Sequence, residues 1–137
     1  MKIFIDTSSL FKKYVEEPGS SQFESLLKKA SEIVVAPIYW LEFNSAIQRR
    51  LQDGKLNLQE TEWIRQEGKK DTAYFSQVRW NENLEVKAHQ MILKYSLKTL
   101  DSIQLAAACL SDADLFIVSD KFLFEKAKKE LNDVKYV

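Results

Sequence analysis

The sequence predicts an α/β fold built around a parallel β-sheet that helices cover on both faces. Short apolar runs rich in β-branched and aromatic residues recur along the 137 residues, and segments with helical spacing separate them. Strands joined through helices make right-handed crossovers, so the strands should run parallel. No internal repeat, low-complexity tract or linker interrupts the pattern, and we expect a single domain over residues 1–137.

The expected elements follow one another along the whole chain. Strands are predicted at 2–5, 33–35, 73–78, 115–118 and 134–137. Apolar residues at helical spacing predict helices at 6–14, 23–30, 37–51, 58–72, 84–95, 99–110 and 120–127. Pro37 suits the first turn of its helix, and Thr99 is the expected cap of the helix that it begins.

Composition limits the classes of protein to which the chain can belong. With 45% hydrophobic and 29% charged residues it can bury a core, unlike a disordered tail. No apolar run approaches the roughly 18–20 residues that cross a bilayer, and the N-terminus has no signal-peptide pattern. Its single cysteine, Cys109, has no partner for an internal disulfide and is expected to fill the core. We therefore expect a cytoplasmic protein without a membrane segment.

The formal net charge is zero. A domain that holds nucleic acid by bulk electrostatics is normally basic, so neutrality argues against a passive nucleic-acid-binding module. It does not exclude an enzyme that holds a phosphodiester through a metal ion, because the ion brings its own positive charge.

Four of the twenty acidic residues stand out by their setting. Asp6 and Asp120 come at the ends of two predicted buried strands. Ligands of open parallel sheets bind beyond the carboxyl ends of the strands, where both side chains should lie. Glu42 and Asp101 lie in helical segments that are too apolar for ordinary solvated acids. A buried carboxylate without a partner costs several kcal/mol, so such groups are usually paired or bound to a metal.

Few cations lie near these acids in the sequence, whereas one divalent ion would satisfy all four. Mg²⁺ and Mn²⁺ prefer hard oxygen ligands, and a carboxylate cluster with such ions can activate water for attack on a phosphodiester. Each acid also has an ordinary explanation. Asp6 and Asp120 would suit helix caps, Asp101 would favour a helix N-terminus, and Glu42 would be a solvated helix residue.

The four acids and their neighbours resemble the PIN-domain nucleases, and among these the VapC-like toxins of bacterial toxin–antitoxin pairs. The matching segments are IDTSSL at 5–10, LEFNSA at 41–46, KTLDSIQLAAA at 98–108 and FIVSDKFL at 116–123. The resemblance implies a three-layer α/β/α sandwich with a five-stranded parallel sheet. It also implies Mg²⁺- or Mn²⁺-dependent endoribonuclease activity, a homodimer, and a cognate VapB-like antitoxin whose tail blocks the site.

By the same resemblance, the four acids hold the metal or its waters and perform the catalysis. Asp6 and Asp101 are the expected direct ligands, with Glu42 and Asp120 completing the site. Ser8 would donate a hydrogen bond that orients a carboxylate or a water. Many relatives carry Ser or Thr two residues before the last acid, where this chain has Val118, so the support of Asp120 by a hydroxyl group is in question.

Other residues offer candidates for substrate contact. Arg49 and Lys98 could hold a substrate phosphate, although exposed cations are often merely solvated. The only histidine, His89, lies on a different helix and is expected to be structural or exposed. Phe11 and Trp40 could stack on RNA bases, but their apolar faces favour the core or a dimer surface.

Other phosphate-handling α/β proteins match less well. A phosphatase of the haloacid dehalogenase type needs a second aspartate at position 8, where this chain has Ser8. A response-regulator receiver needs an aspartate after the third strand, where residues 78–80 read VRW. Two further alternatives remain, namely a non-catalytic PIN-like binding module and an RNA-processing nuclease without an antitoxin.

Overall fold

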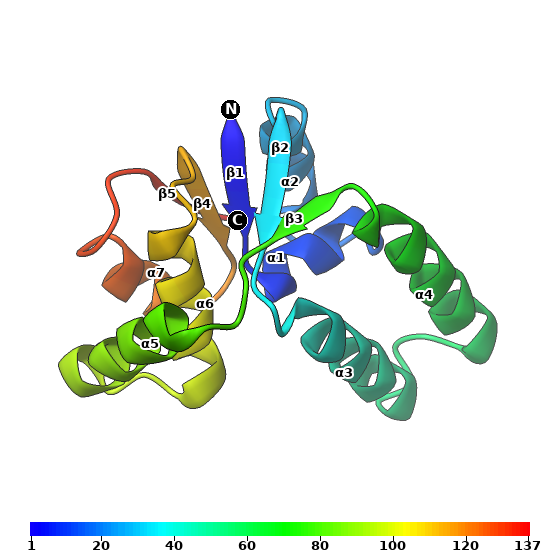
Figure 1. Ribbon diagram of the computed structural model, residues 1–137. Coiled ribbons are helices and arrows are strands. Elements are labelled where there is room, and N and C mark those ends of the chain that lie inside the picture. The colour runs from blue at the N-terminus through cyan, green and yellow to red at the C-terminus, as the bar shows by residue number, and fades with distance from the viewer.

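The computed structural model describes residues 1–137 and shows a five-stranded sheet with helices on both sides (Figure 1). The strands lie in the order β3–β2–β1–β4–β5, and every neighbouring pair is parallel. Their bounds are β1 Lys2–Ile5, β2 Glu32–Val35, β3 Phe75–Gln77, β4 Leu115–Val118 and β5 Val134–Tyr136. This arrangement confirms the α/β fold class predicted from the sequence.

Seven α-helices and one short 3-10 helix connect the strands. They are α1 Thr7–Leu10, η1 Phe11–Lys13, α2 Ser20–Leu27, α3 Tyr39–Gln52, α4 Leu58–Thr72, α5 Glu82–Tyr95, α6 Thr99–Leu110 and α7 Lys121–Ala127. None of them combines the length and the apolar character that a membrane crossing needs.

Alternation along the strands separates two cores, one on each face of the sheet. Phe4, Phe116 and their neighbours pack against α5, α6 and α7. Ile5 and Ile117 point to the opposite face, where they pack near α1 and α2. Since β1 and β4 are buried on both faces, their sequences are continuously apolar from Ile3 and from Leu115 onward.

The sequence placed the elements correctly and erred mainly at their ends. The strand predicted at 73–78 is shorter, because Ala73 and Tyr74 complete the last turn of α4 through hydrogen bonds to Lys70 and Asp71. The N-cap of α6 is Lys98 rather than Thr99, and no side chain caps that helix. The helix predicted at 6–14 is divided into α1 and η1.

A third core joins η1, α3 and α4, on the right of the sheet in Figure 1. Its centre is Phe43, whose ring contacts the rings of Phe11, Tyr14 and Trp40 at centroid distances of 5.3–5.9 Å. Gly68 of α4 lies against the same ring, and a Cβ atom there would come within 2.6 Å of Phe43 Cε1. The absence of a side chain at Gly68 therefore sets how closely α4 approaches α3.

We expect Gly68→Ala to lower the free energy of unfolding by about 1–2 kcal/mol, although alanine is the better helix former by about 1 kcal/mol. The neighbouring rings prevent Phe43 from moving away from the new methyl group. Urea unfolding of the wild type and the variant measures the change. The same substitution in a Phe43→Leu background should cost less, and a Gly68→Ala protein more stable than the wild type would contradict this account of the packing.

Candidate metal centre

Two of the four acids reach the same edge of the sheet through adjacent strands. β1 and β4 pair with Ile5 opposite Ile117, and the Asp6 N–H continues the ladder by donating to the Ile117 carbonyl at 3.0 Å. Asp120 follows β4 by two positions, after Ser119. The chain leaves β1 toward β2 on one side, while β4 lies on the other side. This is the kind of switch point at which open α/β sheets bind ligands.

The other two acids come to this edge on helices. Glu42 lies in the first turn of α3, which follows β2, and Asp101 lies in the first turn of α6, which precedes β4. The negative charges of Glu42, Asp101 and Asp120 all raise the pKa of Asp6. Asp101 also acts on Glu42, and Asp120 acts on Asp101. The structure thus places the other three predicted acids within electrostatic reach of Asp6.

Asp6 is the most confined of these groups. Its side chain is 6% exposed, and burial together with the three other carboxylates raises its pKa from 3.8 to about 7. Burial also raises the pKa of Glu42 and of Asp101, which the nearby Lys98 charge partly offsets for Asp101. None of the four acids forms an ion pair, although other carboxylates of the chain form seven. The site therefore gathers acidic side chains that no ion pair neutralises.

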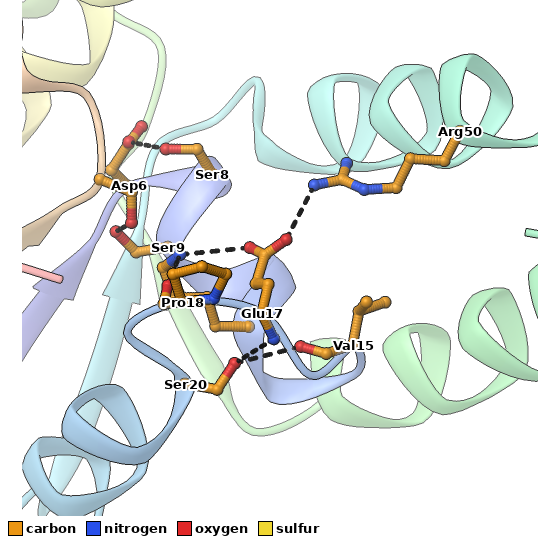
Figure 2. Close-up of polar contacts among 10 residues, drawn as sticks. Asp6, Ser8, Ser9, Val15, Glu17, Pro18, Ser20 and Arg50 are labelled. Carbon is orange, nitrogen blue, oxygen red and sulfur yellow. Dashed lines mark hydrogen bonds and ion pairs between the residues drawn. The ribbon is translucent and has the colours of Figure 1, made fainter. Parts of the chain in front are cut away.

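Neutral donors hold two of the carboxylates. The Ser8 hydroxyl donates to Asp6 Oδ2 at 2.5 Å, and Figure 2 shows the Ser8 side chain turned toward Asp6. Glu42 Oε1 accepts from Thr7 Oγ1 at 3.1 Å and from Gln104 Nε2 at 2.7 Å. These hydrogen bonds favour the ionised carboxylates without cancelling their charge.

The donor set suits a hard divalent cation. It consists of carboxylate and hydroxyl oxygens, and its most buried member lacks a positive partner. No three His, Cys, Asp or Glu side chains are already arranged as a ligand cluster. The residues fit such an ion by chemistry and by charge, and direct ligation would require the carboxylates to draw closer together.

Asp120 differs from the other three acids. It is exposed, and its Oδ1 accepts from the Leu123 N–H at 2.7 Å, so it caps α7. The adjacent Ser119 hydroxyl pairs with Ser9 Oγ at 2.7 Å and gives Asp120 no support. The ordinary explanation as a helix cap thus holds for Asp120. It does not hold for Asp6, whose side chain makes no capping bond.

A cavity of about 760 Å³ opens beside Glu42 and follows α3 away from the sheet. Its lining includes Ser8, Glu42, Ser45 and Arg49. Arg49 is exposed and forms no ion pair, whereas the neighbouring Arg50 lies over the Phe11 ring and reaches Glu17 Oε2 at 3.3 Å (Figure 2). Of these two arginines, only Arg49 is free to contact an anion in the cavity. Lys98 is exposed at the start of α6.

Comparison with known proteins decides the family. A family model described as "PIN domain" matches residues 3–130. The chain belongs to the PIN-domain family. PIN domains are in general nucleases and generally use divalent metals, so membership supports hydrolysis of nucleic acid by this chain.

Solved structures from three bacteria share the fold of this chain. A toxin–antitoxin complex from Klebsiella pneumoniae matches with a TM-score of 0.64 and 18% identity over 86% of both chains. FitAcB from Neisseria gonorrhoeae matches with a TM-score of 0.69 and 13% identity, over 98% of this chain and 96% of the other. VapBC2 from Rickettsia felis, bound to a promoter DNA fragment, matches with a TM-score of 0.67 and 10% identity. The match covers 100% of this chain and 99% of the other. Curated proteins gave no significant sequence match.

The remaining candidates divide between core and surface. Phe11 is buried and therefore unavailable to an RNA base, and half-buried Trp40 stacks on Phe43 and packs against two of the cores. His89 is exposed on α5. Half-buried Cys109 packs against the core.

Sequence reasoning missed Thr7 and Gln104, which both bind Glu42. The sequence suggests Thr7 only as a helix-capping residue. Gln104 carried a usable signal, because it is the one polar residue in the apolar run 103–108 and lies three positions after Asp101, on the same face of the helix.

The raised pKa of Asp6 predicts that the metal-free protein loses stability as the pH rises. Between pH 3.8 and about 7 the unfolded chain ionises while the folded chain keeps the proton, so the free energy of unfolding falls through this window. At about 1.4 kcal/mol per pKa unit, the fall is on the order of 4 kcal/mol. The raised pKa values of Glu42 and Asp101 add a contribution of the same sign.

Urea unfolding in EDTA from pH 4.5 to 8 measures this dependence. Asp6→Asn should remove the largest part of the decline and should be more stable than the wild type at pH 8. Asp112→Asn, a matched change just beyond the far end of α6, should keep the wild-type slope because Asp112 is exposed. Equal slopes for Asp6→Asn and the wild type would show that Asp6 ionises normally in the fold.

Proposed function

We propose that this PIN domain is a Mg²⁺- or Mn²⁺-dependent endoribonuclease and the toxin of a toxin–antitoxin pair. The observation that carries the proposal is the buried Asp6 carboxylate, which lies within the field of three other carboxylates and has no cationic side chain beside it. Burying these carboxylates destabilises the fold unless a ligand compensates them, which argues against a non-catalytic module.

Each acid has a distinct part in the proposal. Asp6 and Asp101 are the direct ligands, while Glu42 and Asp120 hold waters of the ion. Ser8 keeps the Asp6 carboxylate oriented through its hydrogen bond. When bound, the ion supplies an activated water and stabilises the leaving oxygen. Mg²⁺ is the expected ion because the donors are hard oxygens and the site leaves room for water.

Substrate would enter by the cavity along α3. Arg49 lines that cavity and has no carboxylate partner, so it is the residue best placed to hold a phosphate next to the site. Lys98 lies near Asp101 and is the second candidate for holding a phosphate. The other lining residues include Ile38, Leu41 and Leu100 as apolar surface that a base can contact.

The proposal that this chain is a toxin is supported by the structures that share its fold. The solved structures to which the chain is similar include a toxin–antitoxin complex from Klebsiella pneumoniae, together with FitAcB and VapBC2 from two other bacteria. We propose by analogy a homodimer and a VapB-like antitoxin whose tail fills the cavity beside Glu42. A gene for a small protein with a DNA-binding N-terminus next to this one would favour the toxin over an RNA-processing nuclease.

We expect Asp101→Asn to reduce cleavage of cellular RNA by more than about 100-fold, because loss of groups that merely support metal ligands already costs about 10–100-fold. The assay incubates wild type and variant with an RNA panel in Mg²⁺ or in EDTA and maps the 5′ ends of the products. Asp112→Asn is the matched control and should cleave like the wild type. Cleavage that persists in EDTA, or in the Asp101→Asn protein, would exclude the proposed mechanism.

We expect Arg49→Ala to weaken RNA binding several-fold and to lower the salt dependence of log K by about 0.7, because the variant neutralises one phosphate fewer. Fluorescence anisotropy with a single-stranded oligonucleotide, in the Asp101→Asn background and at several salt concentrations, separates binding from cleavage. Arg65→Ala is the control, because Arg65 lies on α4 and hydrogen-bonds Gln48 instead of lining the cavity. Equal losses of affinity for both variants would mean that Arg49 makes no specific contact.

A further inference from the structure

Gln104 is fully buried beside the candidate metal centre, with an exposed fraction of 1%. Its Nε2 donates one hydrogen to Glu42 Oε1 at 2.7 Å and the other to Thr7 Oγ1 at 2.9 Å. The Thr7 hydroxyl donates in turn to the same Glu42 oxygen at 3.1 Å. All three donor hydrogens are thereby used, and the three residues form a closed triangle around Glu42 Oε1.

The triangle connects the elements that carry three of the acids. Thr7 directly follows Asp6, at the start of α1. Gln104 lies one turn beyond Asp101 on α6, and Glu42 is itself on α3. These hydrogen bonds therefore fix the spacing of α1, α3 and α6 where the three helices converge on the site.

The other end of the amide shows that the arrangement is not optimised for the fold alone. Gln104 Oε1 is buried and has no hydrogen-bond partner, and it is the only such side-chain atom in the chain. Leaving a buried acceptor unpaired is unfavourable, and an apolar residue of the same length would avoid that cost. What an apolar residue cannot do is donate to Glu42.

From these contacts we infer that Gln104 is a positioning residue, which holds Glu42 by one oxygen so that the other oxygen is directed to the metal site. The inference rests on the proposed metal-dependent function. A neutral amide suits this task, because an arginine or lysine at the same place would neutralise the carboxylate that the cation needs. Thr7 contributes the second donor and keeps the amide in the required orientation.

The test is a titration of the full chain with Mn²⁺. Calorimetry and the Mn²⁺ electron paramagnetic resonance signal both measure the binding. Gln104→Met keeps the length and the helix propensity of the side chain but removes the donor. We expect it to weaken Mn²⁺ binding about tenfold or more, as loss of groups that orient metal ligands does. The thermal unfolding midpoint of the metal-free protein should stay the same or rise, since the unpaired acceptor is also removed. Gln104→Leu provides a second apolar variant in case methionine packs poorly.

Two comparisons separate positioning from a general effect on the fold. Ser102→Ala removes another buried polar group of α6, whose hydroxyl bonds only the Thr99 carbonyl, and it should leave Mn²⁺ affinity unchanged. In a Glu42→Gln background, Gln104→Met should weaken Mn²⁺ binding little further, because Gln104 acts through Glu42.

The outcomes distinguish this inference from the function on which it rests. A lower unfolding midpoint with wild-type Mn²⁺ affinity would overturn the positioning role and leave the metal site intact. Additive losses of affinity in the double variant would overturn it as well. A wild-type protein that binds no Mn²⁺ would overturn the proposed function and, with it, the role of Gln104.

Discussion

The Asp6 carboxylate is the constraint around which the rest of this structure is arranged. Burial of an uncompensated charge costs several kcal/mol, a large share of the roughly 5–15 kcal/mol that stabilises a typical domain. The chain places this group at the end of β1, the central strand, which β2 and β4 hold from both sides. Because these neighbouring strands fix the backbone of β1, the sheet keeps the carboxylate buried although burial is unfavourable for that group.

All four acidic side chains lie at helix starts, and none of them forms an ion pair with a basic side chain. Asp6 and Asp120 occupy the N-cap positions of α1 and α7, while Glu42 and Asp101 lie in the first turns of α3 and α6. Unpaired N–H groups at a helix N-terminus favour nearby negative charge by a few tenths to about 1 kcal/mol. This contribution is too small to neutralise the acids, so the site still favours a cation.

Strand topology alone brings two of the four predicted acids to the same edge of the sheet. Once 2–5 and 115–118 are recognised as adjacent parallel strands, Asp6 and Asp120 must share an edge. The triangle around Glu42 could not be predicted in this way, because its three members belong to different helices and meet only after packing. A polar residue inside an apolar helical run marks such a contact, but does not tell which partner it will find. Strand β3 was too long in the prediction for a similar reason, since the apolar Ala73 is equally suited to the last turn of α4.

The zero net charge conceals an uneven distribution. Lys12 and Arg50 both form ion pairs with Glu17, and other cations form ion pairs on the surface. The four acids at the carboxyl edge of the sheet form none. An RNA phosphate that approached Asp6 before an ion had bound would meet a concentrated negative field, even though the molecule as a whole is neutral. For the proposed nuclease, metal binding must therefore precede productive contact of the scissile phosphate with the site. In the same proposal, Arg49 farther along the cavity holds the remainder of the strand whether or not the ion is bound.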